Sequence, residues 1–268
     1  MNKRNEKAWD KLSEYYQNSR RLSLDNFHYG AFAPGDKELG ILGDVKGLDV
    51  LDVGCGGGQN SIVLAKMGAK SVKAIDQSEM QLGHARKLAE EQGVSITFLK
   101  RNMEELLGLN DASFDLVVSS HAMNYASDLI RVFNECARVL RSKGRIVICL
   151  NHPLYVVLGQ ALEDDDFSKI VNYFEGIRDI WDWTNADGEM IATFESRSWR
   201  FEHIINGLIE TGFVVERVAE PRGYTKEEMD ELPLDAVPYQ DIGVINEAFI
   251  RTNRIIPSTI IVSAIKKE

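Results

Sequence analysis

The sequence contains little cysteine and no long apolar run. Its 268 residues include three cysteines, Cys55, Cys136 and Cys149, with no Cys-x-x-Cys pair and no histidine spacing typical of zinc sites. We therefore expect reduced thiols, no metal site and a cytoplasmic location. No segment approaches the ~20 apolar residues that cross a bilayer, and the polar segment 1–10 differs from a secretory signal. These absences predict a soluble protein.

Positive charge is also scarce. The chain has 31 lysines and arginines against 41 aspartates and glutamates, a formal net charge of −10. No sustained basic stripe of the kind found in nucleic-acid-binding proteins is present. An anionic membrane surface is disfavoured for the same reason. We expect a small-molecule substrate, and the oligomeric state stays open.

Short apolar segments alternate with amphipathic ones through the first part of the chain. Strands are expected at 48–53, 71–76, 95–100, 114–119 and 145–150. Helices are expected between them at 59–67, 79–91, 103–107 and 128–141. Such alternation is typical of a parallel sheet with helices on both faces, so the predicted fold class is a doubly wound α/β domain.

The regions that flank this pattern have other compositions. Segment 5–18 has the apolar spacing of an amphipathic helix, and with a short helix at 36–43 it makes residues 1–44 a candidate helical lid. Segment 153–197, with an acidic run and a turn-like Asn185–Gly188, is expected to be an inserted cap. A helix at 199–210 and strands at 213–218 and 259–265, separated by a polar irregular region, then complete one domain spanning 1–268.

The most informative segment joins the first strand to the next helix. It runs Leu51-Asp52-Val53-Gly54-Cys55-Gly56-Gly57-Gly58-Gln59-Asn60. Glycines let a backbone turn sharply and approach a ligand closely, and a helix N-terminus points free N–H groups at the same place. Taken by themselves, the glycines are equally well explained by a tight turn that binds no ligand. The second strand, however, ends at Asp76, about 18 residues past the last glycine, where a carboxylate can accept both ribose hydroxyls of an adenosine. The combination favours a nucleotide site.

The glycine spacing separates two kinds of nucleotide site. A dinucleotide fingerprint Gly-x-Gly-x-x-Gly would need a glycine at Gln59. The sequence instead has Asp-x-Gly-x-Gly-x-Gly, and here it resembles the class I S-adenosylmethionine-dependent methyltransferases, in the small-molecule branch that includes the ubiquinone and menaquinone biosynthesis methyltransferases. Four further segments resemble the motifs of that family. They are Asp76-Gln77-Ser78, Arg101-Asn102-Met103-Glu104, Phe114–Ser120 and the turn Arg138–Arg145, in which Ser142 replaces the usual proline.

The resemblance implies a seven-stranded, mostly parallel sheet of order 3-2-1-4-5-7-6, with strand seven antiparallel. It implies S-adenosyl-L-methionine as cofactor and S-adenosyl-L-homocysteine as product, and an N-terminal segment that closes over the cofactor with a tyrosine. The expected cofactor contacts are Tyr16, Tyr29, Asp52, Gly54, Cys55, Gly56, Gly58, Asn60, Asp76, Gln77, Gln81, Asn102, Met103, Ser119 and Ser120. Cys55 is not expected to be a nucleophile, because no histidine is adjacent in sequence.

The acceptor side is less defined by the sequence. His121 follows the fourth strand and His152 the fifth, so both are candidate catalytic bases and substrate contacts, and both are equally well explained as structural histidines. The family resemblance slightly favours His152. In the cap, Tyr155 and Trp183 are candidate walls of an apolar or planar substrate pocket, or part of the cap's own core. Arg197 is either a contact for an anionic acceptor or a surface residue.

The predicted reaction is methyl transfer to a small acceptor by in-line displacement, in which the protein chiefly positions the reactants. A non-catalytic protein that binds or senses S-adenosylmethionine would carry the same glycines and Asp76. A nicotinamide-dependent oxidoreductase is a third alternative, which the glycine spacing disfavours.

Overall fold

A central seven-stranded sheet organises the computed structural model, which describes residues 3–31, 33–175, 178–232, 239–241 and 247–268. The strands lie in the order β4-β3-β2-β5-β6-β11-β9. Their bounds are β2 Asp49–Val53, β3 Ser71–Asp76, β4 Thr97–Lys100, β5 Phe114–Ser120, β6 Leu140–Asn151, β9 Phe213–Ala219 and β11 Thr259–Lys266. Numbered along the chain, this order is 3-2-1-4-5-7-6, and the last strand, β11, is antiparallel to both of its neighbours. The fold class and strand order predicted from the sequence are confirmed.

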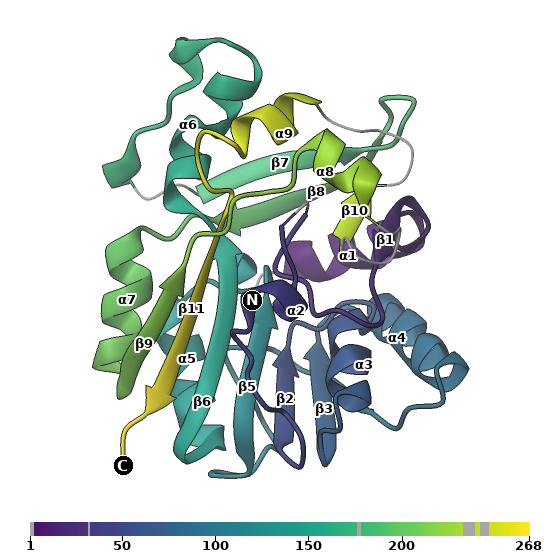
Figure 1. Ribbon diagram of the computed structural model, residues 1–268, viewed down its shortest axis with the longest axis vertical. Coiled ribbons are helices and arrows are strands. Elements are labelled where there is room, and N and C mark those ends of the chain that lie inside the picture. Colours follow the sequence, from purple (N-terminus) through teal and green to yellow (C-terminus); the bar gives the residue numbers. More distant parts are fainter. Residues whose placement is uncertain (1–2, 32, 176–177, 233–238, 242–246) are drawn as a thin grey trace.

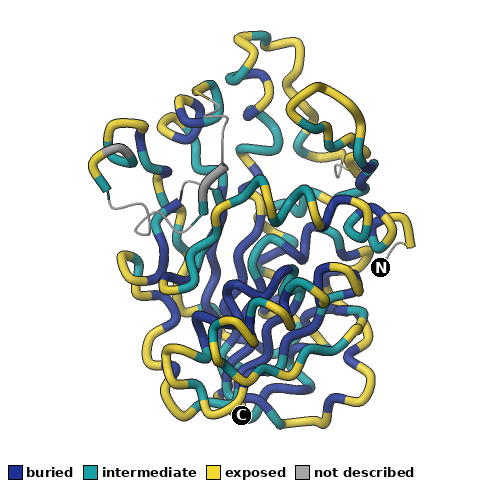
Figure 2. Tube along the Cα trace, turned by 90° about the vertical axis from the view of Figure 1, so that its right-hand side faces the viewer, coloured by how far each residue is buried: buried dark blue, intermediate teal, exposed yellow. Residues whose placement is uncertain are grey.

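Helices pack on both faces of this sheet (Figure 1). One face buries Leu51 and Val117 beneath α5 (Leu129–Val139) and α7 (Phe201–Glu210). The opposite face buries Val50 and Leu116 beneath α3 (Gln59–Lys66) and the segment that includes α2 (Asp36–Leu39). Consecutive strand residues thus belong to two separate cores, as expected for a sheet buried on both sides. Figure 2 shows the buried residues gathered along the strands and the exposed ones in the outer segments.

A second layer of structure lies beyond the carboxyl ends of the parallel strands (Figure 1). The elements of this layer are α1 (Lys3–Ser19), β1 (Arg20–Leu22), α6 (Pro153–Glu163), the hairpin β7–β8 (Arg178–Thr184 and Met190–Arg197), α8 (Lys226–Glu231), β10 (Tyr239–Asp241) and α9 (Glu247–Thr252), with short 3-10 helices η1 (Met123–Tyr125), η2 (Phe167–Lys169) and η3 (Tyr173–Glu175). Helix α1 packs on β8 through a small apolar core formed by Leu12 and Phe194. Strand β1 pairs with β10 in a separate two-stranded sheet. These elements together cover the edge of the sheet where ligands bind in doubly wound folds.

Two expectations about secondary structure are wrong, and one helix ends two residues earlier than expected. Residues 103–107 form turns and not a helix, because the α5 side chains Glu135 and Arg138 bind this segment's backbone at Leu106. Helix α5 ends at Val139, and the predicted turn at Lys143 is an irregularity within β6, with Lys143 at φ 60°. The region expected to be irregular before residue 253 contains α8, β10 and α9.

Helix α4 (Glu79–Glu91) begins at Ser78 with one half of a capping box. Ser78 caps the helix by accepting a hydrogen bond from the Gln81 backbone N–H. The Gln81 side chain does not return to Ser78, because its amide oxygen accepts a hydrogen bond from Gln17 of α1. The helix start is therefore tied to α1.

No helix in the described part of the chain is both long and apolar enough to cross a membrane. The same residues contain no group of three or more histidine, cysteine, aspartate or glutamate side chains arranged to hold a metal ion.

Candidate functional site

The turn between β2 and α3 is shaped by its glycines. Gly54, at φ 78°, lies against Ala122, and a Cβ built on it would come within 2.1 Å of the Ala122 Cβ. Gly56, at φ 52°, faces open space, with nothing within 4 Å of a Cβ built there. A left-handed backbone conformation favours glycine at both positions. The turn is therefore packed tightly at one glycine and left open for a ligand at the other.

Asp76 lies beside this turn, at the end of β3. One carboxylate oxygen accepts a hydrogen bond from the Gly56 N–H (3.0 Å), and the other accepts one from the Ser78 N–H (2.8 Å). Burial raises the pKa of Asp76, against the lowering effect of these backbone bonds. The two N–H donors hold the carboxylate in place and leave lone pairs on both oxygens for further donors.

A second buried carboxylate, Asp52 of β2, lies behind the turn. It accepts a hydrogen bond from the Ser61 hydroxyl at 2.6 Å. Burial raises its pKa to about 7, the Ser61 bond lowers it, and Asp76 raises it further. A bound cation favours the ionised form of both carboxylates, so this part of the site suits a cationic ligand.

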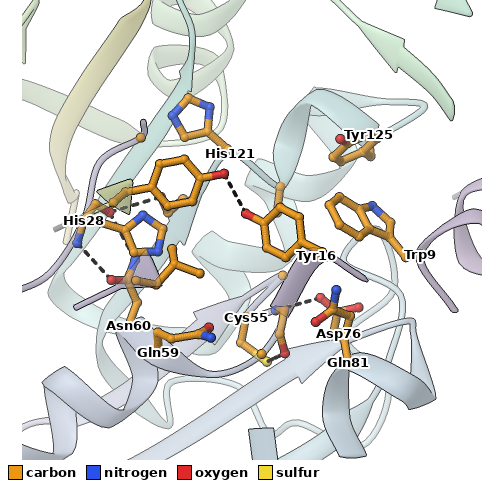
Figure 3. Close-up of a pocket in the computed structure, with 18 of the residues that line it drawn as sticks. Trp9, Tyr16, His28, Cys55, Gln59, Asn60, Asp76, Gln81, His121 and Tyr125 are labelled. Carbon is orange, nitrogen blue, oxygen red and sulfur yellow. Dashed lines mark hydrogen bonds between the residues drawn. The ribbon is translucent and has the colours of Figure 1, made fainter. Parts of the chain in front are cut away.

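A cavity of about 320 Å³ opens above these groups (Figure 3). Its volume lies at the lower end of the range for small-molecule sites. It extends from the carboxyl ends of β2, β3 and β4 to those of β5 and β6, and α1, β10, the hairpin, α6 and α9 supply further walls. Of the predicted site residues, those that line it are Tyr16, Asp52, Gly54, Cys55, Gly56, Asn60, Asp76, Gln77, Gln81, Met103, Ser120, His121, Tyr155 and Trp183.

Four predicted cofactor contacts lie outside this lining. The Tyr29 hydroxyl donates to Asp36 in a fully buried position, and the Ser119 hydroxyl donates to the Val53 carbonyl. The Asn102 side chain accepts from the Glu104 N–H. Gly58 packs against Ala85 of α4. None of these four residues lines the cavity.

The two candidate histidines occupy different environments. His121 lines the cavity just beyond β5, with its backbone at φ 54°. Its Nε2 lies 3.1 Å from the Tyr29 carbonyl oxygen and its Nδ1 lies 3.0 Å from the Asn151 amide oxygen. Burial lowers the pKa of His121. The ring is therefore neutral at pH 7, with a lone pair on one nitrogen.

His152 is the N-cap residue of α6 and does not line the cavity. Its Nδ1 accepts from the Leu154 N–H, which requires the proton on Nε2, and Nε2 donates to a Glu220 carboxylate oxygen at 2.6 Å. Both ring nitrogens are thus engaged in holding the helix. His152 therefore caps α6. Of the two histidines that the sequence singled out, His121 is the one that lines the cavity.

The cap aromatics are divided between two locations. Tyr155 and Trp183 line the cavity. Trp181 stacks on Phe194 at 5.0 Å within the small core beneath α1. Arg197 lies outside the lining, with its guanidinium 6.0 Å from the centre of the Trp199 ring. Trp183 also packs against this small core, so it belongs both to the cavity wall and to the core of the cap.

Several cavity residues were not identified from the sequence. His28 and Asn151 line the cavity near His121, and Tyr239 joins Tyr16 through a hydroxyl–hydroxyl hydrogen bond of 2.9 Å (Figure 3). Burial lowers the pKa of His28 to about 3, so this imidazole is neutral. Tyr16 and Tyr239 are 223 residues apart, and no local pattern could pair them. Gln59 also lines the cavity and was not identified. Its position directly after the last glycine of the turn was the one local signal for it.

Comparison with known proteins agrees with this geometry. The family model described as a methyltransferase domain matches residues 51–148. An uncharacterized methyltransferase of Bacillus subtilis, YbaJ, is 29% identical over 231 residues, which cover 82% of this chain and 90% of that protein. A ubiquinone biosynthesis O-methyltransferase of Rhizobium etli is 36% identical over 104 residues, 39% of this chain, and the match spans only 41% of that enzyme.

Solved structures share the fold. The crystal structure of an S-adenosylmethionine-dependent methyltransferase from Mesorhizobium loti superposes with a TM-score of 0.64 at 25% identity, covering 85% of this chain and 95% of that one. The matched sequence segment contains the glycine turn and Asp76. Together these findings support a class I S-adenosylmethionine-dependent methyltransferase, with the matched methyltransferase domain at residues 51–148.

Proposed function

We propose that this enzyme transfers the methyl group of S-adenosylmethionine to a hydroxyl oxygen of a small acceptor by in-line displacement, with His121 as general base. When bound, the cofactor supplies an electrophilic methyl group on its sulfonium. The observation that carries the proposal is a neutral imidazole lining the cavity next to the glycine turn. A protic acceptor needs such a base at neutral pH, because it carries a proton that must leave.

The described residues fit the cofactor. A carboxylate with free lone pairs at Asp76 suits two ribose hydroxyls, and the open space at Gly56 leaves room for the ligand beside it. The Gln77 amide nitrogen is buried without a hydrogen-bond partner among the described residues, as expected for a donor that awaits a ligand. We assign the adenosyl part to Asp76, Gln77 and Met103, and the sulfonium to the space between the glycine turn and His121.

Contacts at both ring nitrogens fix the orientation of His121. The Tyr29 carbonyl can only accept, so the Nε2 of His121 carries the proton of the neutral ring. The lone pair is then on Nδ1, which faces the Asn151 amide oxygen at 3.0 Å, so the proposal requires the acceptor hydroxyl to enter between His121 and Asn151, which also lines the cavity. Once Nδ1 takes a proton, the Asn151 amide oxygen accepts the new N–H bond and stabilises the imidazolium.

The layer above the sheet accounts for exclusion of water. We propose that residues 1–44 act as a lid and residues 153–197 as a cap on one methyltransferase domain. Tyr16 of α1 and Trp183 of the hairpin, whose ring centres are 5.8 Å apart, both line the cavity. A small cavity that these elements partly cover supports a small-molecule acceptor.

The choice of an oxygen acceptor has independent support. Several relatives carry the name ubiquinone biosynthesis O-methyltransferase, although the match spans only about half of their length or less in the Rhizobium and Caulobacter proteins. The two histidines that line the cavity, His28 and His121, are both neutral and suit an acceptor that donates a hydrogen bond.

The test is a screen of phenols, alcohols, thiols and amines for formation of S-adenosylhomocysteine, followed by His121→Gln with any acceptor found. Loss of a general base is expected to lower kcat by about 10²- to 10⁴-fold while the affinity for S-adenosylhomocysteine stays unchanged. His84→Gln, on α4 outside the cavity lining, is the matched control. Methylation of amines or thiols only, or a His121→Gln variant with the wild-type rate, would overturn the proposal.

A further inference from the structure

Three glutamine side chains from three helices meet beside the glycine turn. Gln59 of α3 donates its amide N–H to the Gln17 amide oxygen at 2.6 Å. Gln17, on α1, in turn donates to the Gln81 amide oxygen of α4 at 2.8 Å. Gln59 and Gln81 both line the cavity and are 8% and 2% exposed. Gln17 is the residue that joins them.

The direction of this chain of hydrogen bonds decides what each end presents. Because the Gln59 nitrogen is turned toward Gln17, its amide oxygen is left without a partner in the described part of the chain. Because the Gln81 oxygen accepts from Gln17, its amide nitrogen is left as a donor with no partner among the residues that the structure describes. An amide has one acceptor end and one donor end, so fixing one end orients the other. The network therefore presents a carbonyl oxygen at Gln59.

Gln17 lies directly on the glycine turn. A Cβ built on Gly57 would come within 2.3 Å of the Gln17 amide nitrogen. The absence of a side chain at Gly57 thus makes room for Gln17 as well as for a ligand. Other contacts hold α1 in the same place, including the Ser78 hydroxyl on Asp10 at 2.6 Å. The bridge is built on a helix whose position is independently fixed.

The strand order determines which part of the cofactor lies near Gln59. Asp76 on β3 suits the ribose, and Met103, beyond β4, lines the cavity on one side of it. The rest of the molecule then extends the other way, over the turn after β2, since the strands run β4-β3-β2-β5. Gln59 is the first residue of α3, directly after that turn. The amino-acid part of the cofactor, which carries an ammonium group, therefore lies near the Gln59 carbonyl.

We infer that Gln17 is a positioning residue for the cofactor, which orients the Gln59 amide so that its oxygen accepts a hydrogen bond from the ammonium of the amino-acid part. Gln17 acts through Gln59. The inference depends on the cofactor and not on the proposed acceptor chemistry of His121, so a failure of either leaves the other testable.

The test compares two ligands that differ only in the amino-acid part. S-adenosylhomocysteine carries it, and 5′-methylthioadenosine does not, so calorimetry with both isolates that contact. Gln17→Met keeps the length of the side chain and removes both hydrogen bonds. Loss of one hydrogen bond to a charged group predicts about tenfold weaker binding of S-adenosylhomocysteine, with 5′-methylthioadenosine binding unchanged. Asn18→Ala, an exposed position on the same helix, is the matched control.

A conservative variant tests the mechanism. A carboxylate can still accept the Gln59 N–H, so Gln17→Glu should restore the binding of S-adenosylhomocysteine that Gln17→Met loses. Gly57→Ala displaces the Gln17 amide and should cost little further affinity when combined with Gln17→Met. Thermal melting checks that each variant folds. Equal weakening of both ligands in Gln17→Met, no weakening of either, or no rescue by Gln17→Glu would overturn the inference.

Discussion

Asp76 offers the sharpest test of the cofactor site, because its bonds can be counted. Each carboxylate oxygen already accepts one backbone N–H, from Gly56 and from Ser78. A carboxylate oxygen has about two lone-pair sites, so one remains on each oxygen for a ligand donor. The two ribose hydroxyls of the adenosyl group match these two positions.

The number of free lone-pair sites on Asp76 determines the expected loss of ligand affinity. A hydrogen bond to a charged group contributes about 1.5–3 kcal/mol, so two of them contribute about 3–6 kcal/mol. Asp76→Ala is therefore expected to weaken S-adenosylhomocysteine binding by about 10²- to 10⁴-fold. Asp76→Asn keeps one amide oxygen and loses the charge, and an intermediate loss of about 10- to 100-fold is expected.

Isothermal titration calorimetry with S-adenosylhomocysteine measures this directly. Asp111→Ala, an exposed aspartate that precedes β5 at the opposite edge of the sheet, is the matched control. Because Asp76→Ala also removes the partners of two backbone N–H groups, thermal melting must show that the variant is folded. A folded Asp76→Ala variant whose affinity lies within about twofold of wild type would refute the ribose assignment.

Three further predictions follow from the same geometry. Burial raises the pKa of Asp52 to about 7, so below that pH a bound sulfonium cation must displace its proton. S-adenosylmethionine should therefore bind more tightly as the pH rises through about 7, relative to S-adenosylhomocysteine, which lacks the sulfonium charge, and calorimetry on Asp52→Asn should show no such difference. Burial lowers the pKa of His121 below 6.5, so kcat should fall on the acidic side only below pH 6.5. A midpoint of this fall above pH 6.5 would contradict the assignment of His121 as the base. Phe194 of β8 is fully buried against α1. Phe194→Ala should lower the free energy of unfolding by about 3 kcal/mol in denaturant melts. A loss below about 1 kcal/mol would show that this core is not packed as described.

Most of the sheet was predictable because its signals are local. Buried strands such as 71–76 are short apolar runs, and α4 and α5 begin at side-chain caps, Ser78 and Asp128. The segment 103–107 was mispredicted as a helix because Glu135 and Arg138, about 30 residues later, satisfy its backbone groups. Tertiary contacts of this kind override local propensity and leave no local trace.

The candidate site likewise contains residues that a local sequence pattern identifies and residues that only tertiary contacts bring together. The glycine turn and Asp76 could be identified because one strand–turn–helix unit and one strand end carry them. The interpretation of His121 and His152 stayed open because both follow strands of the same sheet, and only the Leu154 and Glu220 contacts show that His152 caps a helix. The upper wall depends on Tyr16 meeting Tyr239, a pairing that exists only in the folded chain.

A crystal structure of the protein with S-adenosylhomocysteine tests the central claim most directly. The account predicts both ribose hydroxyls on the Asp76 carboxylate, the sulfur over the glycine turn, and an open path from that sulfur to the Nδ1 of His121. A ligand bound elsewhere in the cavity, or a sulfur screened from His121 by another side chain, would contradict it.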